Sequence, residues 1–292
     1  MLYNIICIVF NFNEGEKLKS TVRVRKKFFY DHFLPSEVGG LFTPWHFFYI
    51  ALTFVSVFLL LHFTKNMKHE TFRKTRFWIA VSTTVAEVIK ITLRVYKGEP
   101  NDTWIPFYFC GLFIFAVWFS MSKNTTLSIL GNAFMTMGGI MAGIIFTLYP
   151  STSLLLYPAW HPSSIHALLY HGVMIYLGTI TLIKREYTPQ KSHWYHYFIY
   201  ITAACVMSIR INPILGTNCM FMDNPFGLPM LTEINDWWRP AYMFLAWIGQ
   251  STLLYWFNLG MYKLCDKRTY RKMRENREMQ KEEELIEAAT KN

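Results

Sequence analysis

Long apolar stretches alternate with short polar loops between residues 41 and 264. A helix needs about 20 mostly apolar residues to cross the roughly 30 Å hydrocarbon layer of a bilayer. A window of that length predicts an all-α polytopic membrane protein, a bundle of about seven transmembrane helices. The predicted spans are Thr43–Phe63, Phe77–Tyr96, Trp104–Met121, Leu127–Tyr149, 163–183, Tyr195–Leu215 and Ala241–Leu264.

The two ends of the chain differ from this central domain at 41–264. Residues 1–40 combine a short apolar stretch with a basic segment, and residues 265–292 are highly charged. The apolar stretch comes before the basic one, the reverse of a secretory signal peptide. We therefore interpret 1–40 as an interfacial segment and 265–292 as a tail. The overall composition, 52% hydrophobic and only 16% charged, fits a membrane protein better than a soluble domain.

Basic residues are concentrated in the loops after the first and fifth spans and in the tail. Lys and Arg resist translocation, so we predict that these three segments share the cytoplasmic side, which makes the C-terminus cytoplasmic. The basic segment at 17–27 would then lie outside, which leaves the side of the N-terminus and the exact span count open. The same topology accounts for the net charge of +10, so we expect no binding to nucleic acid.

Polar groups from several spans are predicted to share one depth. Lys90, Cys110, His171 and Arg210 each lie between five and nine residues from the same end of the bundle. At about 1.5 Å per residue, all four fall in one half of the membrane. Ionisable groups inside a membrane are costly and usually face a cavity or one another, which indicates a functional pocket.

The charges on the second span have two interpretations. Glu87, Lys90 and Arg94 are spaced i, i+3 and i, i+4, so they share one helix face. They form either a self-neutralising pair, with Arg94 extending to the interface, or an anion-binding site. Arg210 has no acidic neighbour on its own helix, so either it pairs with Glu87 across the bundle or it binds a headgroup.

Cys110 and His171 are the candidate catalytic pair. A lone cysteine is usually a small hydrophobe, but a thiol nucleophile needs a nearby base, and imidazole commonly supplies it. His161 and His166 are weaker candidates because they lie nearer the interface, and His166 is about 140° around the helix from His171. The five cysteines show no metal-ligand spacing, and the chain contains no cofactor motif, so neither metal nor cofactor is predicted.

Several short motifs carry a family resemblance. Trp104–Cys110 (WIPFYFC), Tyr170–Tyr176 (YHGVMIY) and Tyr187–Pro189 (YTP), in this order and spacing, resemble the YwaF-like family that includes transmembrane protein 164. Gly216–Phe221, followed by Asn224 and Pro225, is similar to the Gly-x-Asn-x-Met-Phe signature of the bacterial members. The resemblance covers roughly residues 41–264. Tyr108 departs from the bacterial pattern, in which a histidine often precedes the cysteine by two.

The resemblance implies a phospholipid acyltransferase or lipid-ester hydrolase that works through an acyl-thioester on Cys110, with His171 as the base. Lys90, Arg94 or Arg210 would then bind the lipid phosphate, and Asn218 or a backbone amide would stabilise the oxyanion. The partners would be phospholipids and lysophospholipids, and the oligomeric state stays open.

Two other functions compete with this one. A seven-helix transporter or ligand-binding membrane protein would use the layer of Glu87, Lys90, Arg94 and Arg210 as a path for an ion or solute. A membrane scaffold would act through the tail, although mixed charge of this kind usually marks a solvated helix.

Overall fold

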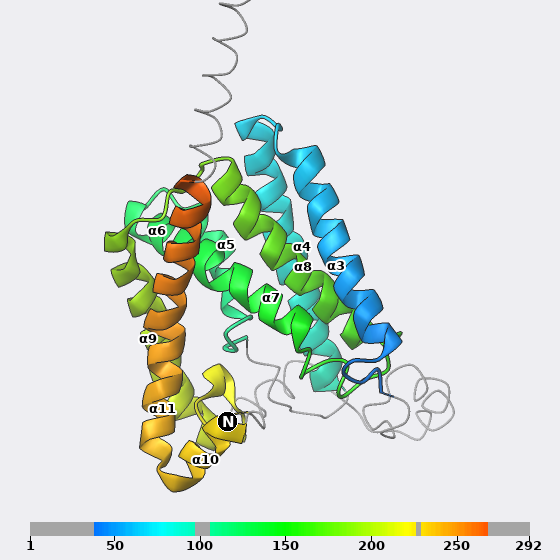
Figure 1. Ribbon diagram of the computed structural model, residues 1–292, viewed down its shortest axis with the longest axis vertical. Helices are drawn as coiled ribbons and strands as arrows, with labels where there is room; N and C mark the ends of the chain where they lie inside the picture. The colour runs from blue at the N-terminus through cyan, green and yellow to red at the C-terminus, as the bar shows by residue number, and fades with distance from the viewer. Residues whose placement is uncertain (1–37, 97–105, 226–228, 268–292) are drawn as a thin grey trace, which may run out of the picture.

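The computed structural model describes residues 38–96, 106–225 and 229–267, and the regular structure within these ranges is helical (Figure 1). Two long stretches each contain a π-helical segment. The first joins α6, η1 and α7, and the second joins α11, η4 and a further helix at 254–267. The elements are α3 (Pro44–Thr64), α4 (His69–Tyr96), α5 (Leu112–Ser120), α6 (Thr125–Ala133), η1 (Phe134–Gly139), α7 (Ile140–Leu148), α8 (Pro162–Ile183), η2 (Lys191–His193), α9 (Trp194–Leu215), η3 (Cys219–Phe221), α10 (Pro229–Trp237), α11 (Arg239–Ile248) and η4 (Gly249–Leu253).

Local sequence explains where three of the long helices begin or end. At the start of α3, the Thr43 hydroxyl accepts the backbone N–H of His46, and a proline occupies the first turn. The start of α8 repeats this arrangement, because the His161 ring accepts the backbone N–H of Ser163. Helix α9 ends at Gly216, whose φ of 63° lies in the left-handed region that glycine adopts without steric cost.

Four described segments are long and apolar enough to cross a membrane, which confirms the first, fourth, fifth and sixth predicted spans. They are α3, the stretch 125–148, α8 and the stretch 191–215. The prediction of seven spans is not confirmed. Helix α4 is 28 residues long but carries charges along its length, α5 has only 9 residues, about 14 Å, and the stretch 239–267 is not among the four.

The prediction that 104–121 forms one helical span is wrong. Residues 106–111 form a turn, and α5 begins only at Leu112. Pro106 disfavours a helix before it, and the chain folds back so tightly that a Cβ on Gly111 would lie 2.7 Å from the Pro106 carbonyl oxygen. Cys110 therefore lies in the turn just before the N-terminal end of α5, not within a helix.

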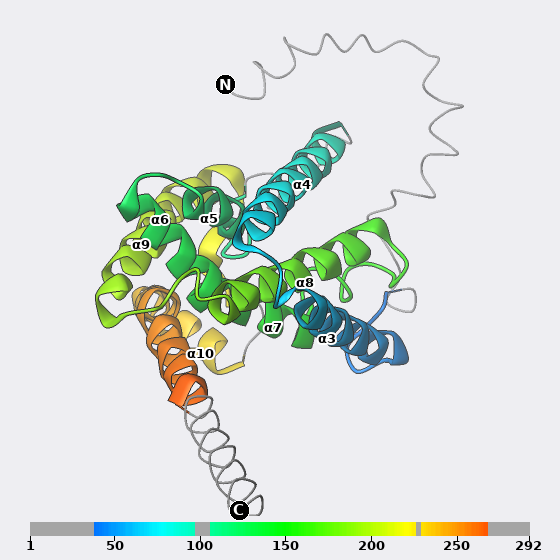
Figure 2. The ribbon, with the colours of Figure 1, turned by 90° about the horizontal axis from the view of Figure 1, so that it is seen from above.

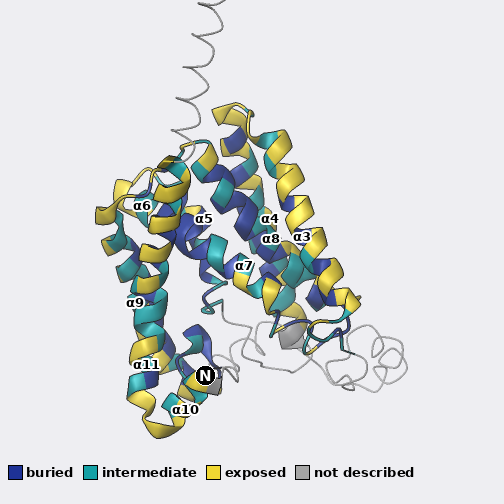
Figure 3. Cartoon of the chain, in the orientation of Figure 1, coloured by how far each residue is buried: buried dark blue, intermediate teal, exposed yellow. Residues whose placement is uncertain are grey.

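The stretch 125–148 lies at the centre of the bundle, and α3 lies at its edge (Figure 3). The most apolar window of 125–148 is 67% buried, whereas that of α3 is only 17% buried. The exposed side of α3 is rich in aromatic side chains, among them Phe47, Phe58 and Phe63. An exposed apolar face of this kind, on a helix long enough to span a bilayer, faces lipid.

Small residues let the central helices approach closely. A Cβ on Gly143 of α7 would lie 2.7 Å from the His171 carbonyl oxygen of α8, and one on Gly178 of α8 would lie 2.6 Å from the Met135 carbonyl oxygen of η1. Helix α8 also packs against α3, and in Figure 2 it runs between α3 and α4. Gly143 and Gly178 thus mark close helix contacts, as small residues at helix interfaces commonly do.

The three basic segments meet at one end of the molecule, the upper end in Figure 1. The Lys184 ammonium donates to the Met67 carbonyl oxygen at 2.5 Å, His69 pairs with Glu186 at 2.6 Å, and Arg185 pairs with Asp266 at 2.7 Å. These contacts join the α3–α4 loop, the segment after α8 and the end of the helix 254–267. The loop after α3 and the segment after α8 therefore share one side, and the first residues of the tail lie beside them. The rest of the tail lies outside the described residues. The assignment of this side to the cytoplasm stays a prediction.

Candidate functional site

Cys110 is half-buried and its turn is tied to α8. Its carbonyl oxygen accepts the Tyr170 hydroxyl at 2.8 Å and the backbone N–H of Phe113 at 3.0 Å. The first bond joins two of the resembling motifs across the bundle, and the second begins the turn into α5. The sulfur thus lies at the N-terminal end of a helix, next to the part of α8 that carries His171.

Helix α4 supplies an ion pair to the same region. Glu87 is buried, Lys90 is 31% exposed, and their charged atoms are 2.6 Å apart. This confirms the predicted i, i+3 pairing. The alternative pairing of Glu87 with Arg210 is wrong, because the nearer lysine satisfies the carboxylate from its own helix. Arg94 lies on α4, but its side chain falls outside the described part of the chain.

The charges of this pair act on several groups of the turn and of α8. Lys90 interacts electrostatically with Cys110, His166 and His171. Glu87 interacts with His166 in the same way. The structure therefore brings α4, the turn at 106–111 and α8 together around one polar cluster, formed by Glu87, Lys90, Cys110, His166, Tyr170 and His171.

His171 is held in one orientation and one tautomer. It is 5% exposed, and its ring lies parallel to that of Phe146 with centroids 3.6 Å apart. Its Nδ1 lies 2.7 Å from the Ala167 carbonyl oxygen. A carbonyl only accepts, so Nδ1 carries the hydrogen and Nε2 carries the lone pair. Nε2 is buried without a hydrogen-bond partner among the described residues, and it is therefore available to accept a proton.

Cys110 and His171 are not hydrogen-bonded to each other within the described part of the chain. No hydrogen bond joins the thiol to the imidazole there, and the two residues are linked through Tyr170, which holds the Cys110 carbonyl and precedes His171 on α8. Their pairing as nucleophile and base stays a prediction.

His166 is closer to the centre of this cluster than sequence reasoning placed it. Its ring stacks on that of Tyr170, with centroids 6.0 Å apart and planes at 19°. It also interacts with both members of the α4 ion pair. The available signal was the i, i+4 spacing to Tyr170, which puts both rings on one helix face. The sequence prediction instead considered the position of His166 relative to His171, which made His166 the weaker candidate.

The structure does not bring Arg210 or Asn218 to the thiol. Arg210 is exposed on α9 and makes no ion pair or hydrogen bond with any described residue. The Asn218 amide oxygen accepts the backbone N–H groups of Asp223 and Asn224 at 2.9 and 3.0 Å, and its Nδ2 donates to the Asn224 carbonyl at 2.8 Å. Asn218 thus stabilises the loop after α9. Their predicted roles at phosphate and oxyanion stay untested.

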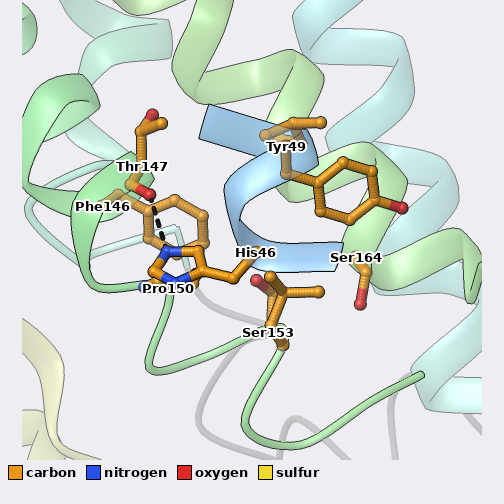
Figure 4. Close-up of a pocket in the computed structure, with 9 residues that line it drawn as sticks. His46, Tyr49, Phe146, Thr147, Pro150, Ser153 and Ser164 are labelled. Carbon is orange, nitrogen blue, oxygen red and sulfur yellow. Dashed lines mark hydrogen bonds between the residues drawn. The ribbon is translucent and has the colours of Figure 1, made fainter. Parts of the chain in front are cut away.

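A narrow hollow lies between α3, the α7–α8 loop and α8 (Figure 4). His46 is fixed there, because its Nδ1 accepts the Phe42 N–H at 3.1 Å and its Nε2–H donates to the Thr147 carbonyl at 3.3 Å. Phe146 lines the hollow and also stacks on His171, so the hollow adjoins the candidate base. Among the described residues, no group of three or more His, Cys, Asp or Glu side chains is arranged to hold a metal ion.

Comparison with known proteins gives one match. Residues 41–259 match the sequence model of the TMEM164 family. No curated protein and no solved structure matches the chain. The match contains the Cys110 turn, the ion pair of α4 and the histidines of α8, together with all four apolar helices long enough to cross a membrane. The chain thus belongs to the TMEM164 family.

Proposed function

We propose that this membrane protein transfers or hydrolyses the acyl groups of phospholipids, with Cys110 as the nucleophile and His171 as the base. The observation that carries the proposal is the state of His171. Its Nδ1–H donates to the Ala167 carbonyl, and its buried Nε2 has no hydrogen-bond partner among the described residues. Fixing one ring nitrogen so that the other faces the reaction is how a catalytic base is oriented. The bond from Tyr170 to the Cys110 carbonyl ties the nucleophile's turn to the same helix.

The chemistry follows from these two groups. The Cys110 sulfur attacks the ester carbonyl carbon, and its proton passes to Nε2 of His171. The tetrahedral intermediate collapses as the ester C–O bond breaks, and the proton moves to the departing oxygen to give a lysophospholipid and an acyl-thioester. Attack by water or by the hydroxyl of a second lysolipid then releases the acyl group and restores the thiol.

Two positive features favour the sulfur anion and the lipid phosphate. Cys110 lies at the N-terminal end of α5, where the helix dipole is positive. Burial raises the pKa of the Cys110 thiol, and the charge of Lys90 acts in the opposite direction, although Glu87 partly neutralises it. A phosphate arriving with the substrate would compete with Glu87 for the Lys90 ammonium. In this proposal the ion pair on α4 is the headgroup contact.

The experiment is intact-mass analysis of purified protein incubated with mixed phospholipids, run alongside measurement of lysophospholipid release. We expect a hydroxylamine-sensitive acyl adduct on the parent protein and none on Cys110→Ser. The matched control is Cys205→Ser, which removes a buried cysteine of α9 and should keep the adduct.

Histidine variants assign the base. His171→Ala should abolish lysophospholipid release. His166→Ala should only slow it, because no described hydrogen bond fixes the tautomer of His166 as the Ala167 carbonyl fixes that of His171. The opposite order would make His166 the base and His171 a packing residue. An absence of both adduct and lysophospholipid from the folded parent protein would overturn the enzyme proposal and favour a transport or binding role for the α4 ion pair.

A further inference from the structure

Arg76 is a buried cation with no counter-ion in contact in the described part of the chain. It lies on α4 at the basic end of the bundle, with only 7% of its surface exposed. Among the described residues its guanidinium makes no hydrogen bond and no ion pair, and Nε is buried without a partner. Its guanidinium lies over the ring of Phe72, with 5.4 Å between the guanidinium carbon and the ring centroid.

The surroundings of Arg76 are predominantly positive. The ammonium of Lys184 lies 6.0 Å from the same Phe72 ring, and Arg73 also interacts with Arg76 electrostatically. Glu186 is the acidic group that acts on Arg76. Its carboxylate, however, is engaged by His69 at 2.6 Å. The Glu186 carboxylate is therefore shared between Arg76 and His69, and it pairs in contact with His69.

A buried charge is stable only when it is paired or hydrogen-bonded, because removing it from water without compensation costs several kcal/mol. Arg76 carries five N–H donors in a planar fork that matches phosphate oxygens. The Lys184 ammonium donates one N–H to the Met67 carbonyl, and its two other N–H groups can donate to a ligand. We propose that Arg76, assisted by Lys184, binds a phosphate group at the basic end of the bundle.

This site is separate from the cluster around Cys110. Arg76 precedes Glu87 by eleven residues on α4, a distance of about 16 Å along the helix axis. The phosphate belongs either to the headgroup of an anionic phospholipid in the leaflet on that side or to a free phosphate ion. The same guanidinium chemistry recognises both, and the inference does not depend on the acyl-transfer proposal.

The test measures thermal unfolding of the full chain in neutral, phosphate-free detergent, titrated with phosphatidylglycerol, phosphatidylcholine or inorganic phosphate. A ligand that binds only the folded state raises the unfolding temperature, and the stabilisation grows with the logarithm of its concentration divided by Kd. We expect phosphatidylglycerol to stabilise the parent protein and to bind Arg76→Met at least about tenfold more weakly, because charge-assisted hydrogen bonds are lost. Full stabilisation by inorganic phosphate identifies a free ion, and stabilisation by phosphatidylglycerol alone identifies a lipid headgroup.

The matched control is Lys74→Gln, which removes the same charge from the same helix at a side chain that is 72% exposed and paired with Glu70. It should leave the titration unchanged. Without ligand, Arg76→Met should be at least as stable as the parent, because it removes an uncompensated buried charge. The proposal is overturned if Arg76→Met fails to fold or is less stable without ligand. It is also overturned if neither ligand stabilises the parent, or if Arg76→Met and Lys74→Gln weaken binding equally.

Discussion

Gly143→Ala tests how tightly the central helix packs against the helix that carries the candidate base. The added Cβ would lie 2.6 Å from Cγ1 of Ile175 and 2.7 Å from the carbonyl oxygen of His171. Ordinary contacts begin at 3.4 Å, so the distance between this Cβ and the His171 carbonyl oxygen must increase by about 0.7 Å. The Ile175 side chain can rotate, but the His171 carbonyl is backbone, so α7 and α8 must separate.

The magnitude combines two opposing effects. Overpacking of this kind costs about 1–3 kcal/mol, and contact with backbone favours the upper end. Replacing glycine by alanine within a helix raises the free energy of unfolding by about 1 kcal/mol, because alanine has the higher helix propensity. The net destabilisation is therefore about 2 kcal/mol, which lowers the unfolding temperature by about 4–8 °C. The shift should also reduce lysophospholipid release, because the backbone that must move carries His171.

Thermal unfolding in detergent, followed by tryptophan fluorescence, measures the effect. The control is Gly260→Ala in the helix 254–267, where a Cβ would meet nothing within 4 Å and only the helix-propensity gain applies. It should unfold at the parent temperature or above. Equal unfolding temperatures for Gly143→Ala and the parent would refute the close approach of α7 to α8.

Two further predictions concern buried polar groups. Asn258→Leu should lower the free energy of unfolding by about 1–3 kcal/mol, because it leaves the Met137 carbonyl without its donor. The Asn258 amide donates to the Met137 carbonyl in η1 at 2.7 Å and to the Leu254 carbonyl at 2.9 Å. An unchanged unfolding temperature would contradict this prediction. Burial raises the pKa of the Tyr187 phenol above its usual value, so the folded state resists ionisation and loses stability as pH rises past the unfolded-state value of about 10. Tyr187→Phe should lose less stability than the parent between about pH 9 and 11, and parallel pH curves would show that Tyr187 ionises equally in both states.

Sequence reasoning succeeded where one local rule was decisive. Apolar runs of membrane length identified α3, 125–148, α8 and α9, because burial in lipid requires a continuous apolar helix. The i, i+3 spacing of Glu87 and Lys90 identified their ion pair, since helical geometry alone brings such side chains together. The grouping of basic residues identified the segments that share one end of the bundle.

Sequence reasoning failed where contacts between backbone segments determine the structure. The apolar run of 104–121 reads as a span, but the close approach of Gly111 to Pro106 turns the chain there and moves Cys110 out of the helix. Depth along separate helices suggested that Arg210 shares a layer with Lys90, yet depth does not specify which way a side chain faces, and Arg210 is exposed.

The amino-acid order by itself determined that this chain is a helical membrane protein and which four segments are long and apolar enough to cross a bilayer, because these depend on local composition and helical period. Only the tertiary structure decided that Tyr170 holds the Cys110 turn, that His166 joins the polar cluster, and that Arg76 is buried with no counter-ion in contact among the described residues. Each of these depends on rotation and close packing of helices distant in sequence. The spacing of apolar residues predicts which face of a helix is apolar, but the tertiary fold determines which helix packs against that face.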